Sequence, residues 1–273
     1  MTALLVIAGQ EVRAGIRNRW VIMTTVILAA LALSLVLLGS TPTGTIGASP
    51  LTVVVVSLAS LTIFLVPLIA LLLSFDSIVG EDERGTLLLL LAYPVSRGQI
   101  VLGKFVGQIT ILALATVVGY GVAGAVLYFG SAGDAENWPD FAVLIGTSIL
   151  LGAVFIALGV LVSIVVRERA TAAGLAVGLW LLLVLVYDLA LVGLLVADQG
   201  KSVTESMLNG LLLLNPTDIY RLINLTGHDA VAQVAGMAAM QTDLSLSALY
   251  AALLAWVALP LAAGVLIFNK RRA

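Results

Sequence analysis

The chain has 273 residues, of which 61% are hydrophobic and only 10% charged, with a formal net charge of −2. It contains no cysteine, which excludes disulfides, thiolate metal ligands and thiol catalysis. Its apolar runs reach the roughly 20 residues that a helix needs to cross the hydrocarbon core of a bilayer. This composition predicts an all-α polytopic membrane protein, in which helices satisfy the backbone polar groups inside the lipid.

Six stretches are apolar enough to be transmembrane helices: Trp20–Leu38, Leu51–Phe75, Phe105–Phe129, Phe141–Val166, Thr171–Ala197 and Ser247–Phe268. Counted on alternate sides of these spans, eleven of the 13 Lys and Arg residues fall on one side, and only Lys201 and Arg221 on the other. The positive-inside rule then predicts that both termini are cytoplasmic. Residues 1–273 are expected to form a single transmembrane domain.

The N-terminal arm, residues 1–19, has the pattern of an amphipathic helix. Apolar and polar residues alternate between two sides at helical spacing: Leu5, Ala8, Val12 and Ile16 against Gln10, Arg13 and Arg17. The pattern predicts an interfacial helix on the inner leaflet, although a cytoplasmic extension of the first span fits it equally. A cleaved signal peptide is disfavoured, because the apolar run that follows is longer than a signal core.

The loop between the second and third spans, residues 76–104, is the most charged internal segment. Charged residues flank a leucine run, with Glu81, Asp82, Glu83 and Arg84 before Leu87–Leu91, and Pro94, Ser96, Arg97 and Lys104 after it. Because adjacent leucines are costly to leave in water, we expect short helices with the leucines under the bilayer and the charges facing the cytoplasm. A solvated loop that only fixes the topology is the alternative.

Part of this loop imitates a phosphate-binding P-loop. Residues 98–104 read GQIVLGK, but the next residue is Phe105 where the motif requires Ser or Thr. No strand precedes the stretch, and a membrane span follows it. The chain therefore lacks the nucleotide-binding motif, and any ATP it uses must be hydrolysed by another protein.

The outer segment between the last two spans, residues 198–246, carries its own helix signals. Ser202 and Glu205 have the spacing of a capping box. Asn215, Pro216 and Asp218 predict the start of a second helix, which would end near Gly227. On that helix, Asp218 and Arg221 are three residues apart and are expected to form a local ion pair.

Asp188 is the most unusual residue inside a span, because an ionised carboxylate is costly in the bilayer. If the fifth span starts at Thr171, Asp188 lies about 25 Å along it and so in its outer third. Two interpretations remain open: a residue that lines a pathway or an intersubunit contact, and a capped carboxylate near the headgroups.

Catalytic and metal-binding patterns are weak. His228 is the only histidine, and Asp229, Met237 and Met240 lie near it in the sequence, so a soft-metal site is conceivable but disfavoured. There is no Ser/His/Asp pattern and no pair of acids suited to intramembrane proteolysis. The chain is therefore expected to be non-catalytic.

Two stretches resemble known membrane proteins. EDERGTLLLLLAYPVSRGQIVLGK is similar to the loop between spans two and three of ABC-2-type transporter permeases, with its acidic cluster, Gly-Thr-Leu, leucine run, Pro-x-Ser-Arg and Gly-Lys. The six-span layout, the amphipathic arm and the long outer loop are also similar. LLLLNPTDIYRLINLTG, residues 211–227, resembles the outer segment of the NosY subfamily, the membrane subunits of the NosDFY transporter of nitrous oxide reductase maturation.

The resemblance implies a type V exporter-like permease in the bacterial inner membrane. Its partners would be a second copy of itself, a cytoplasmic NosF-like ATPase dimer, which would bind the ATP and Mg, and a periplasmic NosD-like protein. The cytoplasmic loop would be the coupling helix that contacts the ATPase, through Glu81, Asp82, Glu83, Arg84, Gly85, Thr86, Pro94 and Arg97. The outer segment would contact the periplasmic protein, through Asn215, Pro216, Asp218, Tyr220 and Arg221.

The implied function is to couple ATP hydrolysis by the separate subunit to transport, or to a conformational signal, for copper-sulfur cluster assembly of nitrous oxide reductase. The alternatives are an ABC-2 exporter of another substrate and an ATP-independent channel or secondary transporter. The last class usually carries ionisable residues along its path, and Asp188 alone is weak support for it.

Overall fold

The computed structural model describes residues 3–17, 19–39, 50–130, 138–198, 203–225 and 244–271. Within these ranges every regular element is a helix, which confirms the all-α prediction. The helices are α1 (Ala3–Ile16), α2 (Arg19–Gly39), α3 (Pro50–Ser74), α4 (Val79–Glu83), α5 (Thr86–Leu91), α6 (Arg97–Gly130), α7 (Trp138–Val165), α8 (Arg169–Leu181), the π-helical turn η2 (Leu182–Val186), α9 (Tyr187–Asp198), α10 (Glu205–Leu213), α11 (Pro216–Leu225) and α13 (Leu246–Lys270).

Among the described residues, five helical runs are individually long and apolar enough to cross a membrane. They contain α3, α6, α7, the α8–η2–α9 run and α13. Helix α2 passes the same test only together with α1, as a pair bent by 66°, which raises the number to as many as six. The predicted six spans lie at the upper end of this range.

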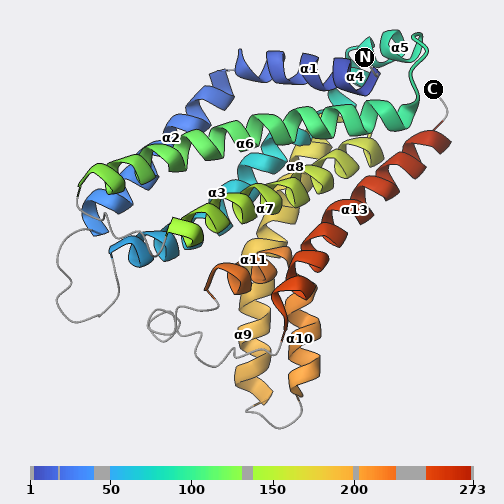
Figure 1. Ribbon diagram of the computed structural model, residues 1–273. Helices are drawn as coiled ribbons and strands as arrows, with labels where there is room; N and C mark the ends of the chain where they lie inside the picture. The colour runs from blue at the N-terminus through green and yellow to red at the C-terminus, as the bar shows by residue number, and fades with distance from the viewer. Residues whose placement is uncertain are drawn as a thin grey trace.

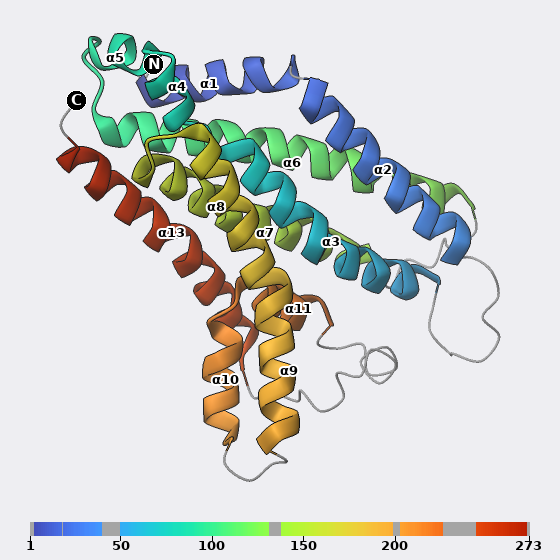
Figure 2. The same ribbon diagram turned by 180° about the vertical axis from the view of Figure 1, so that it is seen from behind.

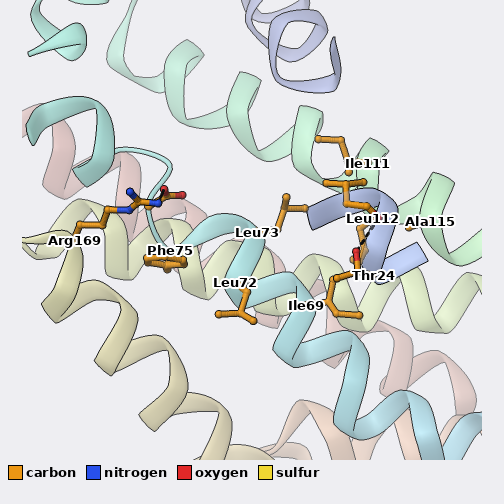
Figure 3. Close-up of a pocket in the computed structure, with 11 residues that line it drawn as sticks. Thr24, Ile69, Leu72, Leu73, Phe75, Ile111, Leu112, Ala115 and Arg169 are labelled. Atoms are coloured by element: carbon orange, nitrogen blue, oxygen red, sulfur yellow. Dashed lines mark hydrogen bonds and ion pairs between the residues drawn. The ribbon is translucent and has the colours of Figure 1, made fainter. Parts of the chain in front are cut away.

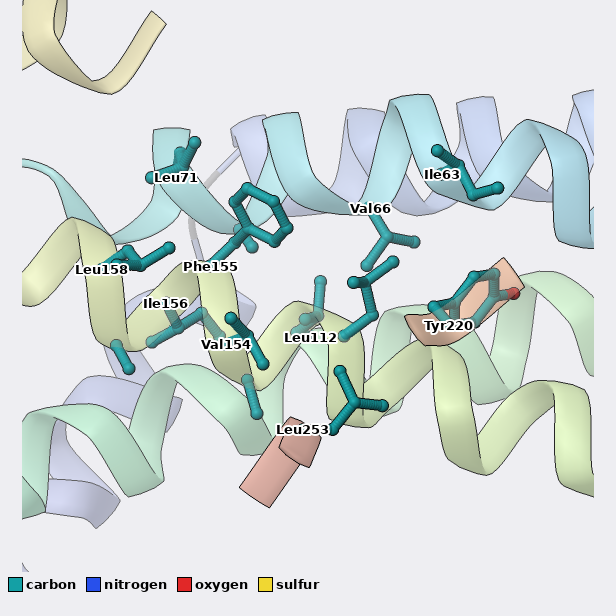
Figure 4. Close-up of a cluster of buried hydrophobic side chains, with 14 of the residues drawn as sticks. Ile63, Val66, Leu71, Leu112, Val154, Phe155, Ile156, Leu158, Tyr220 and Leu253 are labelled. Atoms are coloured by element: carbon teal, nitrogen blue, oxygen red, sulfur yellow. The ribbon is translucent and has the colours of Figure 1, made fainter. Parts of the chain in front are cut away.

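Helix α7 is the centre of the bundle. Of its most apolar stretch, 72% is buried, compared with 17% for the α8–η2–α9 run. Figure 4 shows how Phe155 of α7 lies with Leu71 of α3 and Leu112 of α6 in the buried apolar cluster between these helices. The fifth span is therefore the most loosely packed of the long helices.

The two ends of the described chain lie at the same end of the molecule as α4 and α5 (Figures 1 and 2). At the opposite end, α9 and α10 form a hairpin that extends beyond the bundle, and α11 returns to it beside α7 and α13. The cytoplasmic and outer segments proposed from the sequence are thus separated by the length of the bundle.

Helix α1 lies along α6 rather than continuing the axis of α2. A Cβ atom at Gly107 of α6 would lie only 2.5 Å from the Cβ of Glu11, so a glycine is needed for this close approach. Of the predicted apolar stripe, only Ala8 is buried, whereas Leu5 and Ile16 are more than half exposed. The bend disfavours a simple extension of the first span, and the exposed apolar side of α1 remains available to lipid.

Two predicted helix starts differ from the structure. Helix α6 begins at Arg97 instead of Phe105, because Ser96 and Gln99 form a capping box: each backbone N–H donates to the other's side chain, at 3.0 and 3.2 Å. Residues 98–104 are therefore helical, which agrees with the dismissal of a P-loop. The capping box predicted at Ser202 is wrong, since α10 begins at Glu205 with Thr204 as its cap; Ser202 itself lies outside the described residues.

Candidate functional site

The three acids of α4 each bond to a different part of the chain. The carboxylate of Glu81 is paired with Lys104 of α6 at 2.7 Å. Asp82 is paired with Arg271, just after α13, at 2.8 Å. Glu83 accepts a hydrogen bond from the backbone N–H of Arg169, the first residue of α8, at 2.6 Å. The short helix α4 is thereby attached to α6, α8 and the end of α13, an arrangement that we call the inner charge network.

Lys104 is the buried member of this network. Its side chain is only 3% exposed and lies between two carboxylates, Glu81 of α4 and Glu11 of α1, the latter at 2.6 Å. An ammonium group this deeply buried is stable only if it is paired, and each carboxylate supplies part of that compensation. Lys104 therefore joins α1, α4 and α6 at one point.

Arg97 closes the network at the start of α6. Its guanidinium donates to the backbone carbonyl of Phe268 at 2.5 Å and to that of Arg271, and it lies 5.2 Å above the centre of the Phe268 ring. These contacts attach the start of α6 to the end of α13, beyond which no further helical turn supplies donors. The side chain of Arg97, which was expected to contact the ATPase, thus bonds within the chain.

Helix α5 presents apolar side chains to the surroundings. Gly85 turns the chain between α4 and α5 with φ of +70°, a value that glycine adopts without strain. Leu87 is buried, but Leu88 and Leu89 are 60% and 67% exposed, and Tyr93 is 68% exposed. The expected short helices are present, and because a six-residue helix buries one side only, Leu88 and Leu89 face away from the bundle. That the leucines pack under the bilayer stays a prediction.

The other residues proposed for coupling lie on the same face of the molecule. Arg84, Gly85, Thr86 and Pro94 are exposed, and the hydroxyl of Thr86 donates to the carbonyl of Glu81. Of the eight residues, Glu81, Asp82, Glu83 and Arg97 therefore hold the loop to the bundle. Arg84, Gly85, Thr86 and Pro94, with the exposed α5 side chains, form the surface that another protein can reach.

At the opposite end, α11 is bonded to the π-helical turn of the fifth span. A π turn breaks the regular hydrogen-bond pattern and leaves carbonyls available for other donors. The carbonyl of Leu183 accepts from the side-chain amide of Asn215 at 3.0 Å and from the hydroxyl of Thr217 at 3.3 Å. Asn215 also caps α11, as predicted, by accepting from the N–H of Thr217.

Arg221 links α11 to α9, the next part of the fifth span, by charge. It is paired with Asp218 at 2.7 Å, which confirms the predicted local pair, and with Asp188 of the fifth span at 2.6 Å. Asp188 is therefore paired within the chain, and its two interpretations, a residue lining a pathway or an intersubunit contact and a capped carboxylate near the headgroups, both stay predictions. Burial, together with the neighbouring Asp188 carboxylate, raises the pKa of Asp218 to about 7, although Arg221 opposes the shift. We call these contacts of Asn215, Thr217, Asp218 and Arg221 with the fifth span the outer lock.

Helix α11 is also fixed to α7 by buried polar contacts. The Tyr220 hydroxyl lies 3.1 Å from that of Ser148, and the Asn224 amide bonds to Thr147 at 3.0 Å. Of the residues proposed to contact a periplasmic partner, Asn215, Pro216, Asp218 and Tyr220 are buried inside this chain, and Arg221 is partly buried. These residues hold α11 in place, whereas Met207 of α10 and Leu214 directly after it are exposed.

Sequence reasoning missed several partners in both regions. The Ser96–Gln99 capping box has a recognisable sequence spacing and could have been found. Glu11, Arg169 and Arg271 had no such signal, because each contacts α4 or α6 only through the fold. Within the described residues no group of three or more His, Cys, Asp or Glu side chains could hold a metal ion. His228, Asp229, Met237 and Met240 lie outside that part of the chain.

Residues 5–273 match the family model described as ABC-2 family transporter protein. The chain belongs to this family, the membrane subunits of ABC transporters. It is 47% identical to a protein of Stutzerimonas stutzeri named probable ABC transporter permease protein NosY, with 97% of each chain covered. A protein of the same name from Pseudomonas aeruginosa is 46% identical, with 99% of each chain covered.

Proposed function

We propose that the chain couples ATP hydrolysis by a separate cytoplasmic ATPase to movement of the membrane helices. The observation that carries this proposal is the exposed apolar face of α5, formed by Leu88, Leu89 and Tyr93, next to the inner charge network. Exposed apolar side chains rimmed by charges are typical of protein contacts. Because the acids of α4 hold the ends of α6, α8 and α13, a push on α4 and α5 would reach all three helices.

The biological role that this proposal favours is copper-sulfur cluster assembly of nitrous oxide reductase. Its support is the similarity to two proteins named NosY and the full-length match to the permease family. In this proposal two copies of the chain lie in the bacterial inner membrane with cytoplasmic termini. A NosF-like ATPase dimer binds ATP and Mg, and a NosD-like protein binds on the periplasmic side. The chain transports a substrate or transmits a conformational signal to that protein.

The contact with the periplasmic protein is best assigned to α10, which follows the fifth span. Met207 of α10 and Leu214 directly after it are 51% and 60% exposed, and α10 extends beyond the bundle. The outer lock would then act behind this surface, by setting the position of α9 relative to α11. This assignment replaces a direct contact through the buried Asn215 and Tyr220.

Co-purification of the complex tests the coupling proposal. Leu88 and Leu214 are both 60% exposed, at opposite ends of the molecule, so the same substitution can be compared at each. We expect Leu88→Asp to lose most of the bound ATPase in mild detergent, and Leu214→Asp to retain it. Full ATPase binding by Leu88→Asp would contradict the proposed contact, and a wild-type chain that binds no ATPase would favour a channel or secondary transporter.

A further inference from the structure

A cavity of about 320 Å³ lies between α2, α3 and α6, and Arg169 of α8 lies at one end of it (Figure 3). Eight of its eleven lining residues are apolar. Leu72 is 38% exposed and Arg169 is 52% exposed, so the cavity opens to the side of the bundle. Arg169 also belongs to the inner charge network through its backbone N–H, whereas the other lining residues belong neither to that network nor to the α5 face or the outer lock.

The body of the cavity offers no polar partner to a ligand. Its one hydroxyl, on Thr24, donates to the carbonyl of Val21 at 2.9 Å and is used within α2. The remaining walls are side chains such as Ile69, Leu73 and Leu112. A polar or ionic molecule would lose its hydration there without compensation, whereas a hydrocarbon chain would not.

The end of the cavity has the opposite character. The guanidinium of Arg169 is paired with Asp76 at 2.8 Å and lies 6.0 Å above the ring of Phe75. Arginine has five N–H donors, so one carboxylate leaves donors for a second anion.

The cavity has a charged end and an apolar end, so it suits a ligand that carries a charged group on an apolar chain. Ile69 of α3 lies seven residues before Asp76, which follows the end of the helix, a separation of about 10 Å at the helical rise. In the orientation given under the proposed function, Asp76 and Arg169 lie at the level of the inner headgroups. Basic pockets between transmembrane helices at this level are suited to anionic lipid headgroups.

We propose that this cavity binds an anionic phospholipid of the inner leaflet. One acyl chain lies along α3 between α2 and α6, and the phosphate is held by the N–H donors of Arg169 that Asp76 leaves free. The proposal rests on the cytoplasmic orientation of these helix ends, but it requires neither an ATPase nor a transported substrate. A bound lipid at this position would support the packing of α2 against α3 and α6.

Lipid photo-cross-linking tests the proposal. The full-length chain with its partners is reconstituted into nanodiscs that contain phosphatidylglycerol or phosphatidylcholine, each with the same photoreactive acyl chain. We expect at least tenfold stronger labelling by the anionic lipid, on peptides from α2, α3 and α6. Arg169→Gln should reduce that labelling to the level of the zwitterionic lipid. Ala115→Trp, which fills the cavity, should reduce it about tenfold, and the neighbouring control Leu114→Trp, on the exposed side of α6, should not.

Three results would overturn the proposal: equal labelling by both lipids, labelled peptides elsewhere in the chain, and undiminished labelling of Ala115→Trp. If Ala115→Trp does not fold, the labelling by the two lipids is still compared in the wild type and in Arg169→Gln, and this comparison tests the proposal. Because the chain has no native cysteine, Leu72→Cys also tests whether a second copy fills the cavity. If a disulfide forms between two copies and no lipid is labelled, a second copy fills the cavity and the lipid proposal is overturned. Intact labelling without any bound ATPase would count against the proposed function alone.

Discussion

The inner charge network and the outer lock connect helices by different physical means. Around α4, the ion pairs of Asp82 and Arg271 and of Asp76 and Arg169 are partly exposed. In the outer lock, Asn215 and Thr217 are fully buried, Asp218 is 2% exposed, and all three bond to neighbouring groups. Exposed ion pairs contribute little stability and can exchange partners, whereas buried polar groups are costly to separate. The comparison suggests a deformable inner end and a rigid outer end.

Lys104 is the exception at the inner end, and it gives the largest expected effect. Lys104→Met would leave the carboxylates of Glu11 and Glu81 without their shared cation, at a cost of about 3–5 kcal/mol. For a chain of this size we expect the melting temperature to fall by roughly 10 °C. The melting temperature is measured by heating samples and following the loss of the monodisperse peak in size-exclusion chromatography. Lys270→Met, at an exposed position, is the control. An unchanged midpoint would show that the buried charge is dispensable.

Titration of Asp218 gives the next effect and tests the outer lock alone. Its pKa is raised from 3.8 to about 7 in the folded chain, so between these values the folded state binds a proton more tightly than the unfolded state does. Its contribution to stability is therefore fully present below about pH 4 and is lost as the pH rises through 7. The charged and titratable groups that face it are Asp188, Arg221 and Tyr187.

We expect Asp218→Asn to flatten the dependence of the melting temperature on pH between 4 and 7. Melting the wild type and the variant across this range, in the same detergent, provides the measurement. Asp140→Asn, in the first turn of α7, serves as the matched substitution elsewhere in the chain. If the variant kept the wild-type slope, another group would be responsible for the pH dependence of this region.

Asn215→Ala tests the hydrogen bonds of the outer lock without changing charge. The substitution removes the α11 cap, a donor to the Leu183 carbonyl and a donor to Asp218. Because the remaining groups stay buried, we expect a loss of about 1–3 kcal/mol. The exposed Asn269→Ala, near the end of α13, should change the melting temperature little. Equal effects of the two substitutions would remove the argument that the outer end is rigid.

The sequence predicted the features that depend on neighbouring residues. The helical fold, the short helices of residues 76–104, the Asn215 cap and the Asp218–Arg221 pair all follow from local spacing. Lys104 and Glu11 are 93 residues apart, and only the packing of α1 on α6 brings them together. Asn215 and Thr217 donate to the backbone carbonyl of Leu183 in a π turn, and no side-chain pattern in the sequence predicts such an acceptor. The burial of Tyr220 likewise depends on where α11 meets α7.

The pair of Asp82 and Arg271 should give the smallest effect. Its side chains are 39% and 22% exposed, so Asp82→Asn is expected to cost less than about 1 kcal/mol. At roughly 1 M salt the Debye length is about 3 Å, and the difference from the wild type should largely disappear. Melting temperatures of both proteins at low and high salt provide the test. If Asp82→Asn destabilised the chain as much as Asn215→Ala and did so at every salt concentration, the inner end would be as rigid as the outer end. Movement of α4 and α5 by a bound ATPase would then have to carry the whole bundle as one body.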